Sequence, residues 1–270
     1  MDKLYHYTTF KSLDSILRSK SIWLGNVHYM NDKNEMVQMF DLLKKDLLNE
    51  NSGDEIMIKK LFEDQQKRLA NRPAYIFSMS QDEDDAAQWD RYSNGGAGVC
   101  IQINKNVLKQ LIEDKAQLEE VHYSKEETLP KYRKIIQMYI NEKGNLSEED
   151  KWDLDISFDM INNAAITYKH GSFKSENEVR LCAFPFSASG IDPDKLHYII
   201  TDRGIKEYYS LSLKNKKNES DLKGLIEKII LGPKASVDEH IFGRYLQKVA
   251  GEENIDISGI EIKNSESPLR

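Results

Sequence analysis

Hydrophobic and polar residues follow two different periods along this chain, and each period predicts a different kind of element. Alternation every second residue predicts a short strand, whereas apolar residues three or four positions apart predict an amphipathic helix. The first pattern predicts strands at 4–8, 21–24, 75–80, 99–103, 120–123, 178–184, 196–201, 225–231 and 255–262. The second predicts helices at 10–19, from 36 to 47, at 56–70, around Trp89 and Tyr92, and at 238–249.

Polar residues at three helix starts sharpen these boundaries. Thr9 precedes the first helix and belongs to the residue types that favour the N-cap. The pairs Asp32/Glu35 and Ser80/Glu83 have the three-residue spacing of a capping box. We therefore expect Asp32 to begin the second helix and Ser80 to begin the short helix that follows it.

The order of the elements predicts the fold class. Short strands and helices alternate irregularly, which favours an α+β fold. A chain of 270 residues is long enough for one large domain or two small ones. Because the sequence contains no internal repeat and no convincing linker, we expect a single domain, 1–270, with a mostly helical insertion at about 105–170.

Composition narrows the class of protein. The hydrophobic fraction is 39% and the charged fraction is 31%, which is typical of a globular protein with a strongly solvated surface. The net charge, 38 − 45 = −7, argues against broad affinity for nucleic acid or anionic membranes, although it leaves a local basic cleft open. No apolar run approaches the length of a membrane span and no signal-peptide core is present, so we expect a cytoplasmic protein. Cys100 and Cys182 lie in apolar strands and are expected to be buried free thiols.

The strongest polar cluster spans 174–180 and contains Glu176 and Glu178. Because residues two apart on a strand point to the same face, their carboxylates would repel each other unless a cation or a reacting group lies between them. Such a pair suits acid/base chemistry or the stabilisation of a positive transition state. The alternative is a solvated strand edge on which Lys174 and Arg180 neutralise the two glutamates.

Two further pairs are candidates for a ligand pocket. Ser78 and Ser80 share one face of a predicted strand, where their hydroxyls can hydrogen-bond a ribose or an amide. Trp89 and Tyr92 share one face of a short helix and could form an aromatic platform. Each pair also has a structural explanation, because Ser80 can cap the next helix and the two aromatic side chains can belong to the core.

The first strand, Leu4-Tyr5-His6-Tyr7-Thr8, places one histidine between two aromatic residues immediately before a helix. A strand end holds a side chain rigidly, and the helix start leaves backbone N–H groups free for a ligand. His6 could therefore stack on, or hydrogen-bond to, a flat polar molecule. A metal centre formed by His6, His28 and Asp32 is a weaker alternative, because no HxH or HExxH spacing supports it.

Several of these motifs together resemble a known bacterial group, the domain-of-unknown-function family 2971 (DUF2971). The residues that carry the resemblance extend over nearly the whole chain: Leu4-Tyr5-His6-Tyr7-Thr8, Ser15-Ile16-Leu17, Asn31-Asp32-x-x-Glu35, Phe77-Ser78-x-Ser80, Trp89-x-x-Tyr92, Gly98-Val99-Cys100-Ile101, Lys174-x-Glu176-x-Glu178-Val179-Arg180, Ile230-Leu231-Gly232-Pro233-Lys234 and Ser267-Pro268-Leu269-Arg270. Their combination is more specific than any one of them. The region 105–170 carries little of this signal.

The family in turn looks like a distant relative of ADP-ribosyltransferases, enzymes that use NAD as a substrate. This resemblance implies an α+β fold with a central mixed or antiparallel split sheet flanked by helices. It also implies that three separated strands surround NAD. The first would hold a ribose, the second would shape the nicotinamide pocket, and a later one would carry the catalytic glutamate.

The same resemblance assigns roles to residues of this chain. Glu178 would be the catalytic carboxylate, and Glu176 would complete an E-x-E pair that aligns the incoming nucleophile. His6 matches the first-strand element, and Ser78 with Ser80 matches the second. The residues expected to bind NAD are His6, Tyr7, Thr8, Ser78, Ser80, Trp89 and Tyr92.

The first functional hypothesis is therefore a cytoplasmic, NAD-dependent ADP-ribosyltransferase-like enzyme, in the role of a bacterial toxin or an anti-phage defence effector. Its partners would be NAD or a related nucleotide, an acceptor protein or nucleic acid, and an antitoxin or a defence protein. The alternative hypothesis is a non-catalytic module that keeps the pocket and binds a nucleotide or a protein.

Overall fold

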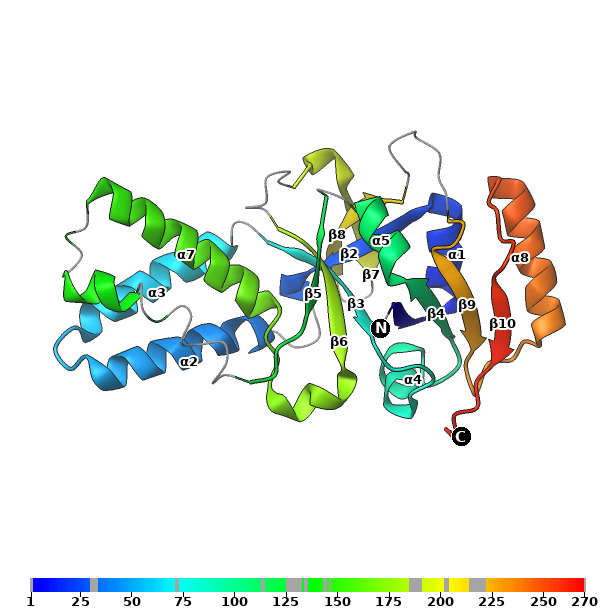
Figure 1. Cartoon of the computed structure of the whole chain (residues 1–270), viewed down its shortest axis with the longest axis horizontal. Coiled ribbons are helices and arrows are strands. Elements are labelled where there is room, and N and C mark those ends of the chain that lie inside the picture. Colours follow the sequence, from blue (N-terminus) through cyan, green and yellow to red (C-terminus); the bar gives the residue numbers. More distant parts are fainter. Residues whose placement is uncertain are drawn as a thin grey trace.

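Ten strands within the described residues form one open, mixed sheet (Figure 1). The structure is a computed structural model that describes residues 2–29, 34–70, 73–112, 115–124, 133, 136–142, 145, 147–184, 191–201, 204–213 and 222–269. The strands are β1 (Lys3–Thr8), β2 (Ser21–Asn26), β3 (Tyr75–Ser80), β4 (Val99–Asn104), β5 (Gln117–Glu120), β6 (Glu178–Ala183), β7 (Leu196–Thr201), β8 (Gly204–Ser212), β9 (Ile226–Leu231) and β10 (Glu261–Asn264). Among the described pairs, β9 and β10 run parallel and the others run antiparallel.

Helices cover this sheet, so the α+β class predicted from the sequence is confirmed (Figure 1). They are α1 (Phe10–Ser19), α2 (Asn34–Glu50), α3 (Glu55–Ala70), α4 (Ala86–Tyr92), α5 (Lys105–Ile112), α7 (Glu148–Ile166) and α8 (Glu239–Glu253). The N-cap prediction for Thr9 is confirmed, because its hydroxyl oxygen accepts the Ser12 N–H at 3.1 Å. Helices α1 and α8 pack together on the main core, where the rings of Phe10 and Phe242 meet edge-on.

A second hydrophobic core lies within α2, α3 and α7, which extend together from one end of the sheet (Figure 1). Phe62 is at its centre and makes edge-to-face contacts with Phe40 from α2 and Phe158 from α7. These three rings are fully buried. Because α7 ends next to the sheet, this helical core holds the segment that leads into the cavity described below.

The sheet is split along one edge of β3. On its other edge, β3 pairs with β6 over its full length, from Tyr75 to Ser80. The split edge is shared by two strands: β2 pairs with the start of β3 at Tyr75 and Ile76, and β1 pairs with its end at Ser80. Within the described pairs, none joins 77–79 to β1 or β2. β1 and β2 therefore diverge from β3 and leave a gap at its centre.

The region 105–170 contributes both helix and sheet. Between α5 and α7, the strand β5 pairs with β6. The strand predicted at 120–123 is shifted by three residues, since β5 covers Gln117–Glu120. It ends there because Val121 N–H donates to Glu178 O and His122 N–H donates to Thr167 O, so the chain turns toward the end of α7.

Two strands near the C-terminus also differ from the sequence predictions. The hydrophobic pattern does not predict β8, because Lys206 and Glu207 interrupt the apolar residues near its start. In the structure both residues line a cavity, which explains why a strand carries charge at this position. The strand predicted at 255–262 begins only at Glu261, because Ile255 and Ile257 pack on the core from a preceding loop.

The capping box predicted for Ser80 and Glu83 is wrong. The short helix α4 begins after Asp85, whose carboxylate accepts the Gln88 N–H at 2.9 Å. Glu83 instead accepts hydrogen bonds from the Tyr5 hydroxyl and the Lys228 ammonium. The other predicted cap, Asp32, lies outside the described residues.

Both cysteines are buried free thiols, as the sequence predicts. Cys100 packs beside Trp89, and Cys182 packs beside Ile76. Within the part of the chain that the structure describes, no helix is long and apolar enough to cross a membrane.

Gly98 lies just before β4 and beside the end of β1, and its close packing gives the first testable prediction. A Cβ atom at this position would lie 2.2 Å from the Thr8 carbonyl oxygen and 2.9 Å from that of Ser93. Because backbone atoms cannot move aside as a side chain can, Gly98→Ala is expected to lower the free energy of unfolding by about 1–3 kcal/mol. Denaturant unfolding followed by circular dichroism measures this loss.

Gly251, in α8, is the matched control. A Cβ added there meets no atom within 4 Å. Gly251→Ala should therefore raise the free energy of unfolding by about 0.5–1 kcal/mol, the usual gain in a helix. Equal effects of the two substitutions would contradict the backbone clash at Gly98.

Candidate functional site

A cavity of about 550 Å³ lies at the split in the sheet. Its wall includes residues from β1, β2, β3, β6 and β8, together with α4 and the 3₁₀ helix η2 (Gly171–Glu176). Most of the predicted site residues line this cavity: His6, Tyr7, Ser78, Ser80, Tyr92, Glu176 and Glu178. Thr8 and Trp89 are not part of its wall.

His6 lies in the gap between the diverging strands. Its Nδ1 donates a hydrogen bond to the carbonyl oxygen of Ser78 at 2.9 Å, and its ring stacks on Phe77 with 3.9 Å between centroids. Because a carbonyl only accepts, the proton must be on Nδ1, and Nε2 is then an acceptor. Burial lowers the pKa of His6 to about 4, so the imidazole is neutral at pH 7. His6 can therefore offer a ligand one hydrogen-bond acceptor but no charge.

The aromatic residues after His6 support the wall from behind. The Tyr7 hydroxyl donates to Asp82 O at 2.8 Å and accepts the Asp85 N–H at 2.9 Å. Trp89 is fully buried and packs edge-on against Tyr7, with 5.0 Å between ring centroids. Thr8 is buried at the end of β1. These contacts hold the loop before α4, and Trp89 and Thr8 have no access to a ligand in the cavity.

The two serines on β3 have different roles. Ser80 is buried, and its hydroxyl donates to Glu176 O at 2.9 Å and accepts the Asp82 N–H at 3.1 Å. Both bonds are to backbone, so Ser80 fixes the loops on either side of the cavity. The Ser78 hydroxyl hydrogen-bonds the Glu178 carboxylate. Ser78 therefore contacts the predicted catalytic residue directly.

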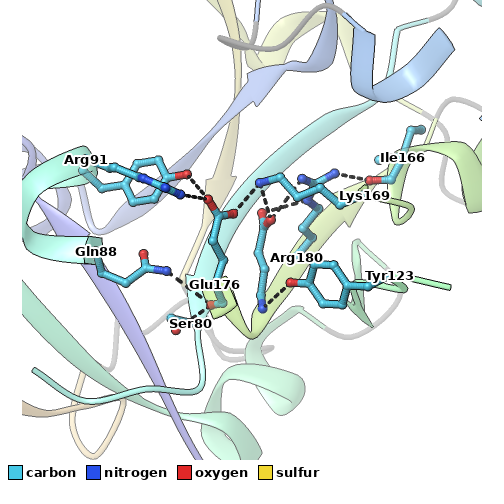
Figure 2. A network of polar contacts seen from close by, with 10 residues as sticks. Ser80, Gln88, Arg91, Tyr123, Ile166, Lys169, Glu176 and Arg180 are labelled. Atoms are coloured by element: carbon cyan, nitrogen blue, oxygen red, sulfur yellow. Dashed lines mark hydrogen bonds and ion pairs between the residues drawn. The ribbon is translucent and has the colours of Figure 1, made fainter. Parts of the chain in front are cut away.

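The carboxylates of Glu176 and Glu178 lie close together, although the two residues do not belong to the same strand. Glu176 is the last residue of η2, and Glu178 is the first residue of β6. Asn177 between them has a left-handed backbone with φ +44°, which turns the chain. Lys169 Nζ lies 2.5 Å from Glu176 Oε2 and 3.1 Å from Glu178 Oε2, so one ammonium bridges the two carboxylates (Figure 2).

Glu178 is enclosed by positive charge. Its carboxylate accepts hydrogen bonds from Arg180 Nε at 2.8 Å and Nη2 at 3.1 Å, in addition to the Lys169 bond (Figure 2). Burial opposes ionisation of Glu178, but the Arg180 guanidinium and the Lys169 ammonium outweigh it and lower the pKa to about 2. Its backbone N–H also donates to the Tyr123 hydroxyl oxygen. Glu178 is therefore a fixed, ionised carboxylate at neutral pH.

Glu176 connects this buried network to the mouth of the cavity. Its Oε1 accepts hydrogen bonds from Arg91 Nη1 at 2.8 Å and from the Tyr92 hydroxyl at 3.0 Å (Figure 2). Burial and the Glu176 carboxylate raise the pKa of Tyr92 to about 12, so its hydroxyl stays protonated and donates. The Arg91 side chain is 49% exposed, so it can contact an incoming ligand while it holds Glu176.

The sequence pattern misses several residues of this site. Glu176 and Glu178 are only 4% and 7% exposed, so they do not form the solvated strand edge considered above. Arg180 does neutralise Glu178, but the second cation is Lys169 rather than Lys174. Lys169 lies in a polar segment after α7, Thr167-Tyr168-Lys169-His170, so no local pattern identified it as a buried cation.

The residues of the metal alternative are not assembled in the described structure. His28 lies in the 3₁₀ helix η1 (Val27–Tyr29), whereas His6 lies on β1, and Asp32 falls outside the described residues. Within the described part of the chain, no group of three His, Cys, Asp or Glu side chains could hold a metal ion.

Comparison with known families identifies one match. Residues 88–181 match the family described as "Protein of unknown function (DUF2971)", which supports the family predicted from the sequence motifs. The matched segment begins within α4, at Gln88, and includes the four buried charges at Lys169, Glu176, Glu178 and Arg180. No curated protein and no solved structure matches the chain.

The environment of His6 predicts its titration. Since burial favours the neutral imidazole, a pKa of about 4 is expected for His6, below its ordinary value of 6.5. Two-dimensional NMR of the histidine side chains as a function of pH measures this value, and His6→Asn identifies the signal. A His6 signal that titrates near pH 6.5 would contradict the buried, Nδ1-protonated state.

The charge network predicts how stability depends on pH. The Glu178 pKa falls from 4.5 to about 2 on folding, so the unfolded chain binds more protons between these pH values. The stabilisation is fully present above pH 4.5 and is lost as the pH falls toward 2, by about 3 kcal/mol. Denaturant unfolding across this range measures it.

Glu178→Gln separates this contribution from those of other carboxylates. The variant should be less stable than the wild type at pH 7, because Arg180 and Lys169 lose their anion. Its stability should also fall less steeply between pH 4.5 and 2. Identical slopes for the two proteins would mean that Glu178 does not supply this pH dependence.

Proposed function

We propose that this member of the DUF2971 family is an ADP-ribosyltransferase-like enzyme that binds NAD, or a related nucleotide, in the cavity. The observation that carries the proposal is that residues from three strands, distant from one another in the sequence, line the same cavity. His6 from β1, Ser78 from β3 and Glu178 from β6 line one cavity. These are the three elements that the resemblance requires around NAD.

The chemistry of the wall supports a nucleotide ligand. A volume of about 550 Å³ lies in the range of ordinary small-molecule sites. Tyr92 and Phe173 offer aromatic faces for a base or a nicotinamide ring. The half-exposed Arg91 guanidinium can pair with a phosphate, and neutral His6 Nε2 can accept a hydrogen bond from a ribose hydroxyl.

In the proposed reaction, Glu178 stabilises the positive charge that develops on the ribose. The bond between C1′ and the nicotinamide nitrogen breaks, and its electron pair leaves with nicotinamide, which becomes neutral. A lone pair of the acceptor then forms the new bond to C1′, and the acceptor proton passes to a base or to water. An ionised carboxylate is the state that this electrostatic role needs, and Lys169 and Arg180 keep Glu178 ionised.

The proposal extends to the setting of the enzyme. In this proposal, the gap where β1 and β2 diverge from β3 corresponds to the split of an ADP-ribosyltransferase-like sheet. The acceptor would be a protein or a nucleic acid in the cytoplasm, and the role would be that of a toxin or an anti-phage defence effector. An antitoxin or a defence protein would then be its partner.

One observation favours a second function, a non-catalytic module that binds a nucleotide or a protein. Both oxygens of Glu178 already accept hydrogen bonds from Arg180 and Lys169. A ribose hydroxyl that reaches Glu178 competes with these donors, and Lys169 is the donor that can give way because it keeps Glu176 as its partner. A module that only binds ligand would leave the network intact.

Titration calorimetry with NAD and a chromatographic assay of nicotinamide release test the first function. Wild-type protein should bind NAD and release nicotinamide, faster when cell lysate supplies an acceptor. Glu178→Gln should lower the release rate by about 100-fold or more, because charge stabilisation of this kind is large in a buried site. NAD affinity should change little, since the amide keeps the shape of the side chain.

Glu252→Gln is the matched control, because Glu252 is exposed on α8 and pairs with Arg18 away from the cavity. It should retain both binding and release. If wild type binds NAD without release and Glu178→Gln binds equally well, the binding module is the correct function. If wild type neither binds NAD nor releases nicotinamide, the NAD-dependent proposal is wrong.

A further inference from the structure

Glu207, on β8, is a cavity residue with no counterpart in the sequence motifs. Its Oε1 accepts hydrogen bonds from the Tyr75 hydroxyl at 2.6 Å and from Asn26 Nδ2 at 2.8 Å. The Tyr198 hydroxyl also hydrogen-bonds this carboxylate. These donors come from β3, β2 and β7, so four strands position one side chain.

The charge of Glu207 is not neutralised as those of Glu176 and Glu178 are. Within the described residues, no lysine or arginine forms an ion pair with it, and its three hydrogen-bond donors are neutral. Burial opposes the charge of Glu207, but the hydrogen bonds from Tyr75, Asn26 and Tyr198, with a smaller contribution from the nearby His28, outweigh it and lower the pKa. The carboxylate therefore keeps a full negative charge at neutral pH.

The neighbouring Lys206 does not cancel this charge. Successive residues on a strand point to opposite faces, so the two side chains diverge. No ion pair joins them in the described structure, although both line the cavity. Because no lysine or arginine among the described residues pairs with Glu207, its negative charge is available to a ligand.

Aromatic rings surround the carboxylate. Tyr29, which is 50% exposed, lines the cavity together with Glu207. Tyr75 and Tyr198 direct their hydroxyls toward it. The faces of tyrosine rings attract cations, and an ionised carboxylate accepts charge-assisted hydrogen bonds from N–H groups.

We propose that Glu207, with Tyr29, forms a subsite that binds a cationic nitrogen group, an ammonium or a guanidinium, of a ligand in the cavity. The Glu207 carboxylate would repel a phosphate or a carboxylate, and such an anionic group would bind Arg91 instead. The inference that this cationic group belongs to the acceptor molecule rests on the proposed function. Cation binding itself does not, and it can be measured without NAD.

Small monovalent probes test the subsite directly. Titration calorimetry at low ionic strength would compare ethylguanidinium and n-butylammonium with ethylurea, which resembles the guanidinium in shape but carries no charge. Wild-type protein should bind at least one of the cations about tenfold more tightly than ethylurea. The cation that binds more tightly distinguishes a guanidinium ligand from an ammonium ligand.

Two variants locate the binding. Glu207→Gln should weaken cation binding by about tenfold, because it removes the charge and keeps the oxygen that accepts from Tyr75 and Asn26. Tyr29→Leu should weaken it about threefold through loss of the exposed ring, and the fold should tolerate this change at the surface. Glu252→Gln on α8 should bind as wild type does.

The outcomes separate this inference from the proposed function. If wild type binds cations no better than ethylurea, or if folded Glu207→Gln and Tyr29→Leu both bind as wild type does, the subsite is wrong. Should Glu207→Gln fail to fold, the Tyr29→Leu result decides. Cation binding without NAD binding would support the subsite and contradict the NAD proposal. NAD binding without cation binding would support the NAD proposal and contradict the subsite.

Discussion

Four buried charges dominate the cavity: Lys169, Glu176, Glu178 and Arg180. Each would cost several kcal/mol if it were taken out of water alone, so the group is stable only when every member has its partner. Lys169 is central because its ammonium contacts both carboxylates. The segment after α7, the end of η2 and the start of β6 must therefore assemble together, and each depends on the other two.

The split in the sheet lies at the cavity and creates a backbone requirement of its own. At the centre of β3, the edge toward β1 and β2 has no strand partner in the described pairs. The Ser78 carbonyl on this strand accepts a hydrogen bond from His6 instead. A buried carbonyl needs such a donor, so the proton on Nδ1 is explained by the fold. The same bond leaves Nε2 available to a ligand.

Charge is distributed unevenly around the cavity. On the side of η2 and β6, cations match the carboxylates, and Arg91 extends the positive charge to the mouth. On the side of β2 and β8, Glu207 has only neutral donors among the described residues. The two sides therefore favour ligand groups of opposite charge. A molecule with an anionic and a cationic end would have one preferred orientation.

Local patterns in the sequence determined the elements: the alternation of β1, β3, β4 and β6, the periodic helices, and the Thr9 cap all depend on near neighbours in the chain. The motifs also pointed to the family and to several residues of the cavity wall. Only the tertiary structure decided the partners. Ser80 binds the backbone of Glu176 instead of capping α4, and Lys169 bridges two carboxylates. Periodicity reports which face of an element is buried, but the partner of a buried polar group comes from a different element, and its distance along the chain carries no such signal.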